Sequence, residues 1–324
     1  MQCSILDLAS VREGGTVAQA LSDSVELAQH AESCGLARFW LAEHHGLPGV
    51  ASAATAVLIG QVAAHTNRIR VGAGGIMLPN HAPLIVAEQF GTLEALFPGR
   101  IDLGLGRAPG SDGPTQRALR RPVDAAQSFV NDIQELQHWF AEPASELLLC
   151  AVPGAGANVP LWILGSSTYG AEVAAALGLP YAFASHFAPA QLTEALQRYR
   201  SGFVPSKQLQ RPHVMLAINV VVADSEDEAQ WLFSSLQQAF LRLRRGQPGR
   251  FPPPTRVYLT GVERELLSQV LSCSFVGTRE QVREGLKSFV ERHQPDELIM
   301  TIPVYERGAR LKSLKDAAEA VLEL

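Results

Sequence analysis

The sequence has no excess of positive charge, and this absence excludes a large class of proteins. It carries 27 Lys and Arg against 32 Asp and Glu, which gives a formal net charge of −5. A protein that binds nucleic acid needs a basic surface to neutralise the phosphates. The densest basic run, between Arg242 and Arg250, is most simply a solvated helix C-terminus that complements the helix dipole. We therefore expect no nucleic-acid partner.

Cysteines and long apolar runs are also scarce. The four cysteines lie far apart and form no C-x-x-C pair, which excludes a zinc ribbon, a redox dithiol and a dense disulfide scaffold. No apolar run approaches the roughly 20 residues that span a bilayer. The first residues lack the basic and then apolar pattern of a secretory signal. We expect a cytoplasmic protein with no membrane partner.

What the sequence does contain is a repeated alternation of short β-rich runs and stretches with helical periodicity. Its 324 residues, 47% of them hydrophobic, can bury a sizeable core without disulfides or a structural metal. The expected strands are 4–9, 39–42, 69–78, 101–105, 161–164, 181–185, 214–223 and 297–303. The expected helices are 17–34, 52–65, 84–97, 124–140, 170–177, 189–199, 225–243, 279–293 and 309–322.

Eight strand–helix units in one chain predict a (β/α)8 TIM barrel. We expect a single domain over residues 1–324, with irregular insertions at about 108–123 and 244–260. The main alternative is an open doubly wound sheet, which usually carries a glycine-rich fingerprint after its first strand. Residues 10–15 supply none, and the nearest pattern, 104–110, has the wrong spacing and a proline that prevents a clean helix start. The barrel is the favoured prediction.

Polar residues follow most of the expected strands, whereas the opposite strand ends look plainer. In a barrel, catalytic and binding groups collect at the C-terminal ends of the strands. We therefore expect an active-site mouth at that end. The segments at that end are 43–45, 72–75 on the third strand with 79–81 after it, 106–107, 165–167, 185–187 and 301–303.

Histidines are the first candidates, because imidazole can move a proton near neutral pH. The adjacent His44 and His45 point to opposite sides of an extended segment, so at most one of them faces the mouth easily. Such an arrangement offers a metal poor ligand spacing, and we expect no metal site. One catalytic or ligand-contacting histidine is the preferred interpretation. His81 and His186 fit a structural hydrogen-bonding role equally well.

Glycines interrupt the third expected strand. Gly72, Gly74 and Gly75 weaken an otherwise apolar run, because glycine packs no side chain and loses backbone entropy. One explanation is a bulge or tight packing inside a barrel. The other is the close approach of a flat ligand, and the residues alone favour neither.

An arginine and a hydroxyl-rich loop follow the next two strands. Arg107 offers a planar donor fork for a phosphate or a polarised ring carbonyl, although a structural ion pair would explain it as well. The loop 165–170 joins a strand to a helix start. There Ser166 and Ser167, with the free helix amides, form either an anion site or a simple helix cap.

Taken together, these motifs resemble the bacterial luciferase-like family of flavin-dependent monooxygenases. The resemblance extends from Ser4 to about Phe187 and returns at 275–278. The sequence is more similar to the unassigned luciferase-like oxidoreductases, including those of polyketide tailoring, than to luciferase itself. The segments that carry it are 40–45, which matches the strand with the catalytic histidine, 71–79, which matches the flavin-facing strand, 99–107, which ends in the flavin-contacting arginine, and 164–180, which matches the phosphate loop and its helix.

The resemblance implies a role for each site residue. His44 would transfer a proton as the reduced flavin reacts with oxygen. The isoalloxazine ring would lie against Ala73, Gly74 and Gly75, where the family typically has a non-proline cis peptide, expected here between Gly74 and Gly75. The phosphate end would be held by Arg107, Ser166, Ser167 and Gly170.

Several positions depart from luciferase. Gly106 stands where luciferase has a reactive cysteine, Ser166 replaces an acidic residue and Gly170 replaces a threonine. The segment 244–260 does not match the luciferase lid, so light emission and long-chain aldehyde specificity are not implied.

The resemblance also implies the partners. We expect reduced FMN from a separate flavin reductase, O2, and a small organic substrate. An F420-dependent oxidoreductase and a flavin-binding protein without turnover remain alternatives. Family members often form homodimers through helices beside the early strands. Ala54, Val57 and Leu58 could serve such an interface, although packing onto the barrel explains them equally well.

Overall fold

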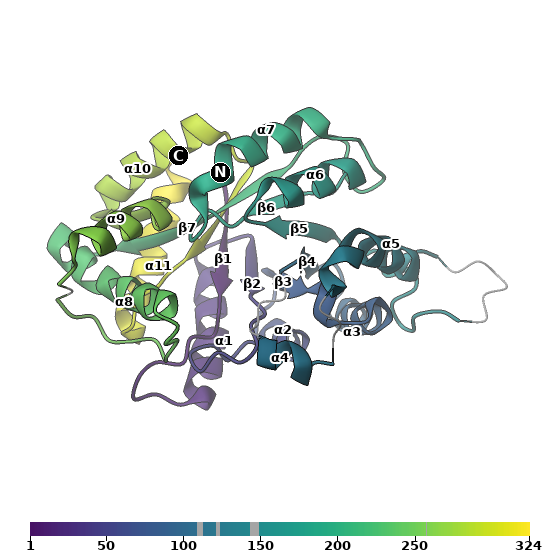
Figure 1. Ribbon diagram of the computed structural model, residues 1–324, viewed down its shortest axis with the longest axis horizontal. Coiled ribbons are helices and arrows are strands. Elements are labelled where there is room, and N and C mark those ends of the chain that lie inside the picture. The colour runs from purple at the N-terminus through teal and green to yellow at the C-terminus, as the bar shows by residue number, and fades with distance from the viewer. Residues whose placement is uncertain (109–112, 121–123, 143–148, 257) are drawn as a thin grey trace.

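Parallel strands close into a barrel at the centre of the molecule. The computed structural model describes residues 1–108, 113–120, 124–142, 149–256 and 258–324 (Figure 1). All strand pairs in this part of the chain are parallel, and the pairing of β1 with β9 and of β6 with β7 closes the ring β1-β2-β3-β4-β5-β6-β7-β9. The strands are β1 (Gln2–Asp7), β2 (Arg38–Leu41), β3 (Arg70–Met77), β4 (Ile101–Gly106), β5 (Leu161–Gly165), β6 (Tyr181–Phe183), β7 (Val214–Val222), β8 (Ser274–Gly277) and β9 (Glu297–Thr301).

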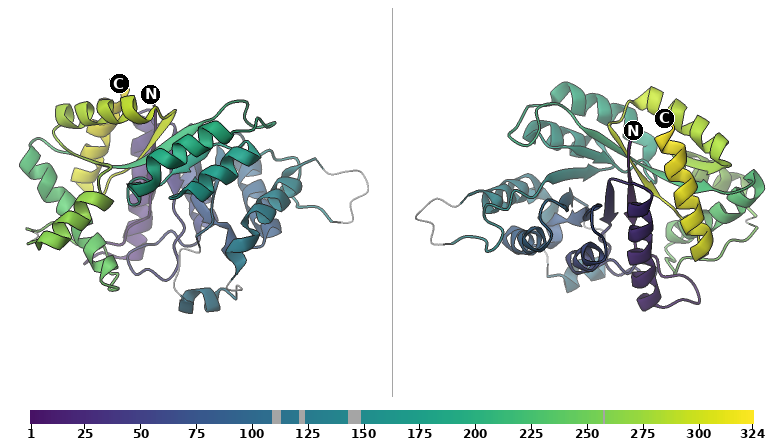
Figure 2. Two further views of the ribbon diagram at one scale, coloured as in Figure 1. Left: turned by 45° about the horizontal axis from the view of Figure 1, so that its top comes forward. Right: turned by 180° about the vertical axis from the view of Figure 1, so that it is seen from behind.

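Helices surround the barrel in every view (Figures 1 and 2), and the two chain ends lie near each other. No helix among the described residues is both long enough and apolar enough to cross a membrane. The helices are α1 (Val17–Ser33), α2 (Thr55–Ala64), α3 (Pro83–Leu96), α4 (Gly113–Ala118), α5 (Phe129–Phe140), α6 (Thr168–Leu177), α7 (Leu192–Gly202), α8 (Glu226–Arg244), α9 (Gly261–Val270), α10 (Arg279–His293) and α11 (Arg307–Leu322), with short 3-10 turns at Leu78–Asn80, Ala125–Ser128 and Pro189–Gln191.

Local sequence signals explain the ends of α1. The Thr16 side chain accepts a hydrogen bond from the Gln19 amide, and the Gln19 side chain accepts one from the Thr16 amide, so the expected capping box is present. The helix stops at Gly35, whose φ of +76° lies in the left-handed region that glycine adopts without steric cost. Both signals were readable from sequence, and both confirm the expected helix.

The strands separate two apolar layers. Side chains that point outward pack against the helices in one large core. Side chains that point inward form a smaller cluster within the ring, in which the Trp40 and Trp162 rings meet edge to face at 5.2 Å. Successive residues of a strand face opposite sides, which is why neighbours in sequence belong to different layers.

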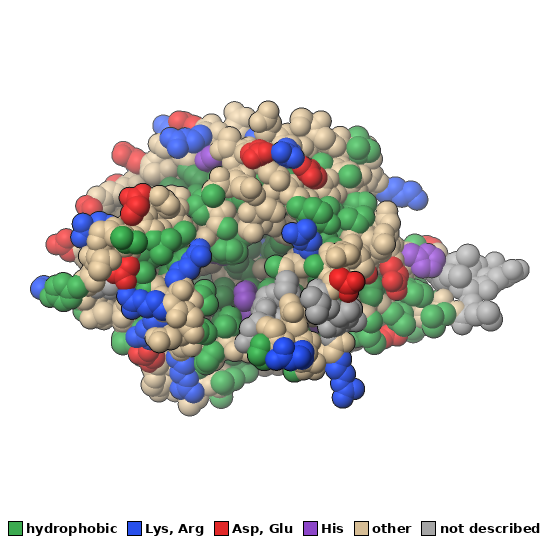
Figure 3. All heavy atoms as spheres, in the orientation of Figure 1, with side chains coloured by type: hydrophobic (Ala, Val, Ile, Leu, Met, Phe, Trp, Pro, Cys, Tyr) green, Lys and Arg blue, Asp and Glu red, His purple; other side chains and the backbone are tan. Residues whose placement is uncertain are grey.

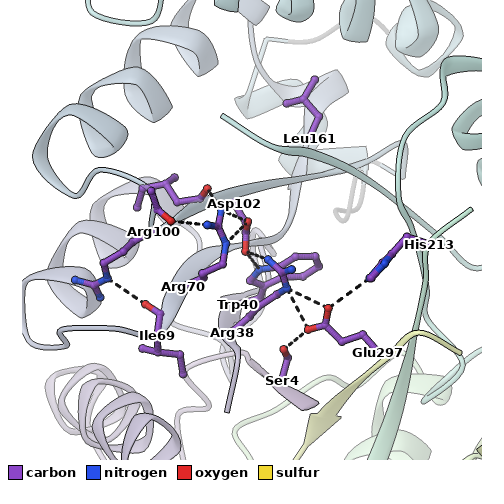
Figure 4. A network of polar contacts seen from close by, with 12 residues as sticks. Ser4, Arg38, Trp40, Ile69, Arg70, Arg100, Asp102, Leu161, His213 and Glu297 are labelled. Atoms are coloured by element: carbon purple, nitrogen blue, oxygen red, sulfur yellow. Dashed lines mark hydrogen bonds and ion pairs between the residues drawn. The ribbon is translucent and has the colours of Figure 1, made fainter. Parts of the chain in front are cut away.

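A polar network closes the barrel at the N-terminal ends of the strands (Figure 4). The Arg38 guanidinium lies between two fully buried carboxylates, 2.7 Å from Asp102 and 3.1 Å from Glu297. Arg70 also binds Asp102, and the Ser4 hydroxyl donates to Glu297. The network joins strands from both ends of the chain and fills the end of the barrel where the strands begin.

The fold confirms the predicted TIM barrel and corrects its details. The eight expected strands form the ring, but β8 was not expected. It pairs with the C-terminal half of β7, over Asn219–Val222, and so lies outside the ring. Helix α9 was also missed, although Thr260 and Glu263 form a capping box at its start, and Leu267 is the one residue that it buries. Residues 245–256 and 258–260 are irregular, as expected, whereas 257 and, in the expected insertion 108–123, residues 109–112 and 121–123 lie outside the described residues.

Candidate functional site

A cavity of about 1010 Å³ opens at the C-terminal ends of the barrel strands. Every strand of the closed ring contributes to its wall, and most of the lining side chains are apolar. In Figure 3 the surface is hollowed near its centre, where hydrophobic, basic and histidine side chains border the opening. On the side toward the N-terminal ends of the strands, the cavity is bounded by the inward-facing cluster that contains Trp40.

The structure brings nearly all of the sequence-predicted residues to this cavity. His44 and Arg107 lie on the same rim, as the prediction required. Ala73 is the exception, because its side chain faces outward and is fully buried in the large core. The alternation along β3 then turns the next residue inward. The residues that line the cavity are His44, Gly74, Gly75, Arg107, Ser166, Ser167 and Gly170.

His44 follows β2 and lines the cavity, whereas His45 turns away from it. The Nδ1 atom of His44 is enclosed and has no hydrogen-bond partner. Burial lowers the pKa of the His44 imidazole, and this effect outweighs the opposing charge of Glu43. The ring is therefore neutral at pH 7 and is able to accept a proton.

Behind His44, the Glu43 carboxylate gathers three donors. Its Oε1 lies 2.6 Å from His45 Nε2 and 2.8 Å from His81 Nε2, and its Oε2 accepts the Met77 amide at 3.1 Å. Burial alone would raise the pKa of Glu43, but the hydrogen bonds from His81 and His45 hold it below its ordinary value. The cluster therefore ties the end of β2 to the end of β3.

The same three side chains could also hold a metal ion, since their ligand atoms lie within 4.8 Å of one another. Adjacent residues in the sequence do not reveal this arrangement, because His81 comes from a different strand end. The hydrogen bonds to Glu43 account for the cluster without a metal, and a metal-free site stays a prediction.

The glycines of β3 serve close packing, and two of them also line the cavity. The peptide between Gly74 and Gly75 is cis, and the pairing of β3 with β4 shifts register between Ala73 and Ile76. A Cβ on Gly75 would lie 2.6 Å from the Gly104 carbonyl oxygen, and one on Gly74 would lie 2.7 Å from Leu6 Cδ1. The structure therefore confirms the explanation by a bulge with tight packing, whereas the approach of a flat ligand to this exposed backbone stays a prediction.

The loop between β5 and α6 presents an open helix N-terminus to the cavity. Ser167 is the N-cap residue of α6, yet its side chain makes no capping hydrogen bond, so the first amides of the helix stay available. The Tyr181 hydroxyl donates to the Ser167 carbonyl at 3.0 Å and fixes the loop. A Cβ on Gly170 would meet Gly165 Cα at 3.3 Å, which explains the small residue at that position.

Arg107 completes a positive edge beside this loop. Its guanidinium lies 3.9 Å from the centre of the Tyr169 ring, a cation–π contact that positions the side chain. Within the described residues it forms no ion pair. The helix amides and the guanidinium together make a positive edge, whose chemistry suits an anion.

His186, for which the sequence left a structural role equally open, follows β6 and also lines the cavity. Its carbonyl accepts from Asn219 Nδ2 at 2.7 Å, and the Thr301 hydroxyl donates to Asn219 Oδ1 at 2.7 Å. Burial, reinforced by nearby His44, lowers the pKa of His186 to about 4. Its position at a strand end was the available signal, but that signal did not separate it from a structural histidine.

Comparison with known proteins places this geometry in a family. The model of the luciferase-like monooxygenase family matches residues 1–294. A luciferase-like monooxygenase of Escherichia coli K12 is 49% identical over 99% of this chain and 97% of its own length. The N-acetyl-S-alkylcysteine monooxygenase of Bacillus subtilis 168 is 32% identical over 99% of this chain and 98% of its own.

Solved structures of similar proteins support the same family assignment. Apo-MsnO8 superposes with a TM-score of 0.87 at 34% identity and covers 99% of this chain and 98% of its own. Two others show the fold alone: the oxygenating constituent of 3,6-diketocamphane monooxygenase with FMN, from the CAM plasmid of Pseudomonas putida (TM-score 0.74, 16% identity), and an F420-dependent secondary alcohol dehydrogenase (TM-score 0.71, 15% identity). They cover 98% and 99% of this chain, and 97% and 98% of their own. With this barrel, this rim and these relatives, the chain belongs to the luciferase-like monooxygenase family.

Proposed function

We propose that this protein is a monooxygenase that uses reduced FMN, supplied by a separate reductase, and O2 to oxygenate a small organic substrate. The observation that carries the proposal is the convergence of His44, Arg107 and the open N-terminus of α6 on one apolar cavity. The diketocamphane enzyme, named as an oxygenating constituent and bound to FMN, supports the same division of labour between two components.

The residues present fit FMN. The anion edge formed by Arg107, Ser166, Ser167 and Gly170 suits a phosphate, and the side-chain-free backbone at Gly74 and Gly75 suits a flat ring. Ala73 would contribute only its backbone, since its side chain faces outward. Small-molecule sites usually measure about 300–1,000 Å³, so a cavity of about 1010 Å³ has room for a flavin and a second small molecule.

Each part of the site has a chemical task. Bound reduced FMN would supply the two electrons that let one oxygen atom of O2 enter the substrate while the other leaves as water. The neutral His44 ring accepts and returns the proton that this exchange requires. The apolar walls exclude water from the reacting groups.

The test is a stopped-flow experiment in which the protein with reduced FMN is mixed with O2. We expect delayed appearance of oxidised FMN, through an absorbing species that differs from free FMN. His44→Gln should shorten the delay or lower turnover by about 100-fold or more, a typical contribution of a positioned acid–base group. His65→Gln, at an exposed position in the same chain, is the matched control. Immediate reoxidation by the unmodified protein would contradict the proposal.

Two alternatives have their own signatures. Hydride transfer with F420, which the F420-dependent structural neighbour suggests, predicts tighter equilibrium binding of F420 than of FMN. A flavin-binding protein without turnover predicts tight binding of oxidised FMN and no change on His44→Gln. Equilibrium binding of both cofactors to the unmodified protein and to His44→Gln separates the three.

We also propose a homodimer. Ala54, directly before α2, and Val57, on α2, are exposed, Val57 by 77%, whereas Leu58 is only 6% exposed and packs into the large core. The interface would therefore use the first two and not Leu58. Sedimentation should give about twice the chain mass of 34.9 kDa, and Val57→Glu should shift it toward the single-chain value. A single-chain mass for the unmodified protein would contradict this.

A further inference from the structure

Arginines outnumber carboxylates around the cavity. Among the described residues seven arginines line it, against Asp7, Asp23 and Glu26. The whole chain has a net charge of −5, so this excess of positive charge belongs to the cavity and not to the protein as a whole. Basic side chains stand on both sides of the hollow in Figure 3. One of the seven is Arg107, and the other six follow β1, β7 or β9, on the side of the ring away from the proposed phosphate edge.

Ion pairs compensate four of these six arginines. The pairs are Arg12 with Asp23 at 2.6 Å, Arg310 with Asp7 at 2.7 Å, Arg242 with Glu13, and Arg307 with Glu26. Every carboxylate that lines the cavity is therefore already engaged by an arginine. These pairs hold the loops and helices of the rim together, and they leave no negative charge for the remaining two arginines.

The remaining two are Arg244 and Arg250, which form no ion pair within the described part of the chain. The Arg244 guanidinium, at the end of α8, lies 5.7 Å from the centre of the Phe240 ring. Arg250 Nη1 donates to the Gly15 carbonyl at 2.9 Å. An aromatic ring and a carbonyl position these side chains without cancelling their charge, so both keep a full positive charge and free N–H groups.

The segment that carries Arg250 has a fixed place at the cavity. Residues 245–256 follow α8 and return to the loop after β1. There the Phe251 amide donates to the Val11 carbonyl at 2.9 Å, and the Glu13 amide donates to the Phe251 carbonyl at 2.8 Å. This backbone pairing sets the position of Arg250 beside the cavity before any ligand binds.

The same side of the cavity also has an extended apolar wall. Ala217 on β7 and Ile299 on β9 point into the ring, and Leu236 and Phe240 on α8 line the cavity above them in the chain order of the rim. A positive charge beside an apolar wall attracts an anion more strongly than one surrounded by water does. An apolar wall with uncompensated arginines matches a molecule that has an apolar body and an anionic group.

We infer that Arg244 and Arg250 bind the anionic group of the substrate, and that the substrate is an organic acid whose apolar body lies along the β7–β9–β1 side of the cavity. The planar guanidinium fork suits a carboxylate. The inference rests on the proposed function for the identity of this molecule as the substrate. The site is separate from the phosphate edge, because Arg107 and the start of α6 follow β4 and β5.

The test is equilibrium binding, by isothermal titration calorimetry, to the full-length protein without flavin. Three probes share one apolar body and differ in charge: 4-phenylbutyrate, 4-phenylbutyramide and 4-phenylbutylammonium. We expect the carboxylate to bind about tenfold more tightly than the amide, as for a charge-assisted hydrogen bond, and the ammonium to bind most weakly. Salt at about 1 M, where the Debye length is about 3 Å, should remove most of this preference.

The double variant Arg244→Met with Arg250→Met should lower carboxylate binding to the level of the amide and leave the amide unchanged. The matched control is Arg68→Met with Arg211→Met, which removes the same charge at exposed positions before β3 and β7, at the other end of the barrel, and should change nothing. Arg107→Met should leave 4-phenylbutyrate binding unchanged, whereas the first double variant should leave FMN binding unchanged.

Three results would overturn the inference. They are equal binding of carboxylate and amide by the unmodified protein, loss of the preference in Arg107→Met but not in the Arg244 and Arg250 variant, and the same loss in the control variant. The first would mean that the arginines are only solvated, and the second that the anion occupies the phosphate edge. No reduced flavin or O2 is used, so these outcomes are independent of the stopped-flow test of the proposed function.

Discussion

At the residue scale, the rim holds two kinds of buried ionisable group. Glu43 is fully supplied with donors from His45, His81 and the Met77 amide, and its carboxyl pKa is lowered in spite of burial. The imidazoles of His44 and His186 each keep an enclosed Nδ1 without a partner, and burial lowers both of their pKa values. The first arrangement stabilises the fold, whereas the second costs stability and leaves the rings ready for a ligand.

The pKa of His186 predicts a specific dependence of stability on pH. Burial, with a smaller contribution from His44, lowers this pKa from 6.5 to about 4, so below pH 6.5 the unfolded chain takes up a proton that the folded chain refuses. Stability is therefore present above pH 6.5 and is lost as the pH falls toward 4. The loss from this group is about 3 kcal/mol, from roughly 2.5 pKa units at about 1.36 kcal/mol each.

Urea unfolding at pH 7 and pH 4 measures the effect. The unmodified protein should lose about 3 kcal/mol more than His186→Gln between these two values, since the carboxylates titrate in both proteins and cancel. Equal losses would mean that the folded protein accepts a proton on His186.

At the scale of single elements, the site depends on how β4, β5 and α6 end beside one another. Helix α6 begins without a side-chain cap, and Arg107 at the end of β4 is held by the Tyr169 ring in the first turn of that helix. Neither feature stabilises its own element strongly. Together they leave unsatisfied amides and a positive charge at one edge of the cavity, which suits a phosphate.

Removing the charge of Arg107 while keeping a long side chain tests whether this edge binds the phosphate. Arg107→Met should weaken FMN by about tenfold or more, as expected for a charge-assisted hydrogen bond, and should leave riboflavin, which lacks the phosphate, nearly unchanged. Arg211→Met, at an exposed position before β7 and therefore at the other end of the barrel, controls for net charge. Fluorescence titration with both flavins provides the measurement. Parallel weakening of the two would place the arginine near the ring instead.

The contact between β3 and β4 predicts a strict need for glycine. A Cβ on Gly75 would lie 2.6 Å from the Gly104 carbonyl oxygen and 2.8 Å from its carbon, and backbone atoms within a barrel have little room to move. Gly75→Ala should therefore reduce the free energy of unfolding by about 1–3 kcal/mol. Gly261→Ala at the start of α9 has open space around it and should be neutral or slightly stabilising. If both variants unfold at the same urea concentration, the close contact is not limiting.

At the scale of the whole molecule, the barrel has a polar network at the N-terminal ends of its strands and a mostly apolar cavity at their C-terminal ends. Arg38 links Asp102 on β4 with Glu297 on β9, and both carboxylates are fully buried. These two strands are far apart in sequence, and β9 also pairs with β1. The network thus holds the ring closed where the N- and C-terminal parts of the chain meet.

Removing the central cation should be far more damaging than removing a surface one. Arg38→Met leaves two buried carboxylates without their shared partner, and we expect a loss of about 3–5 kcal/mol in the free energy of unfolding. Arg198→Met breaks ion pairs with Glu172 and Glu194 that are about half exposed and screened by water, and it should leave the free energy of unfolding nearly unchanged. Thermal and urea unfolding of both variants measure the two losses of stability. Similar losses would show that water reaches the Arg38 network at the N-terminal ends of the strands.

Much of the architecture was determined by local sequence. Apolar strand-length runs, helical periodicity and caps such as Thr16 with Gln19 specify elements through contacts between near neighbours, so the eight-strand barrel could be predicted. The positions of His44, Arg107 and Ser167 followed from one topological rule, because the C-terminal ends of parallel strands share one face of the barrel. Helix α9 carries a comparable signal, the Thr260 and Glu263 capping box, that was overlooked, whereas the four-residue β8 is too short to show a pattern.

Only the tertiary structure decided which of these residues act together. The three donors on Glu43 come from two strand ends, and the opposition of His44 and His186 exists only once β1 pairs with β9 and the ring closes. The same closure buries both imidazoles and sets their pKa values. Periodicity reports which side of an element is apolar, but it carries no information about distances across a barrel, since those depend on pairings between residues more than a hundred positions apart.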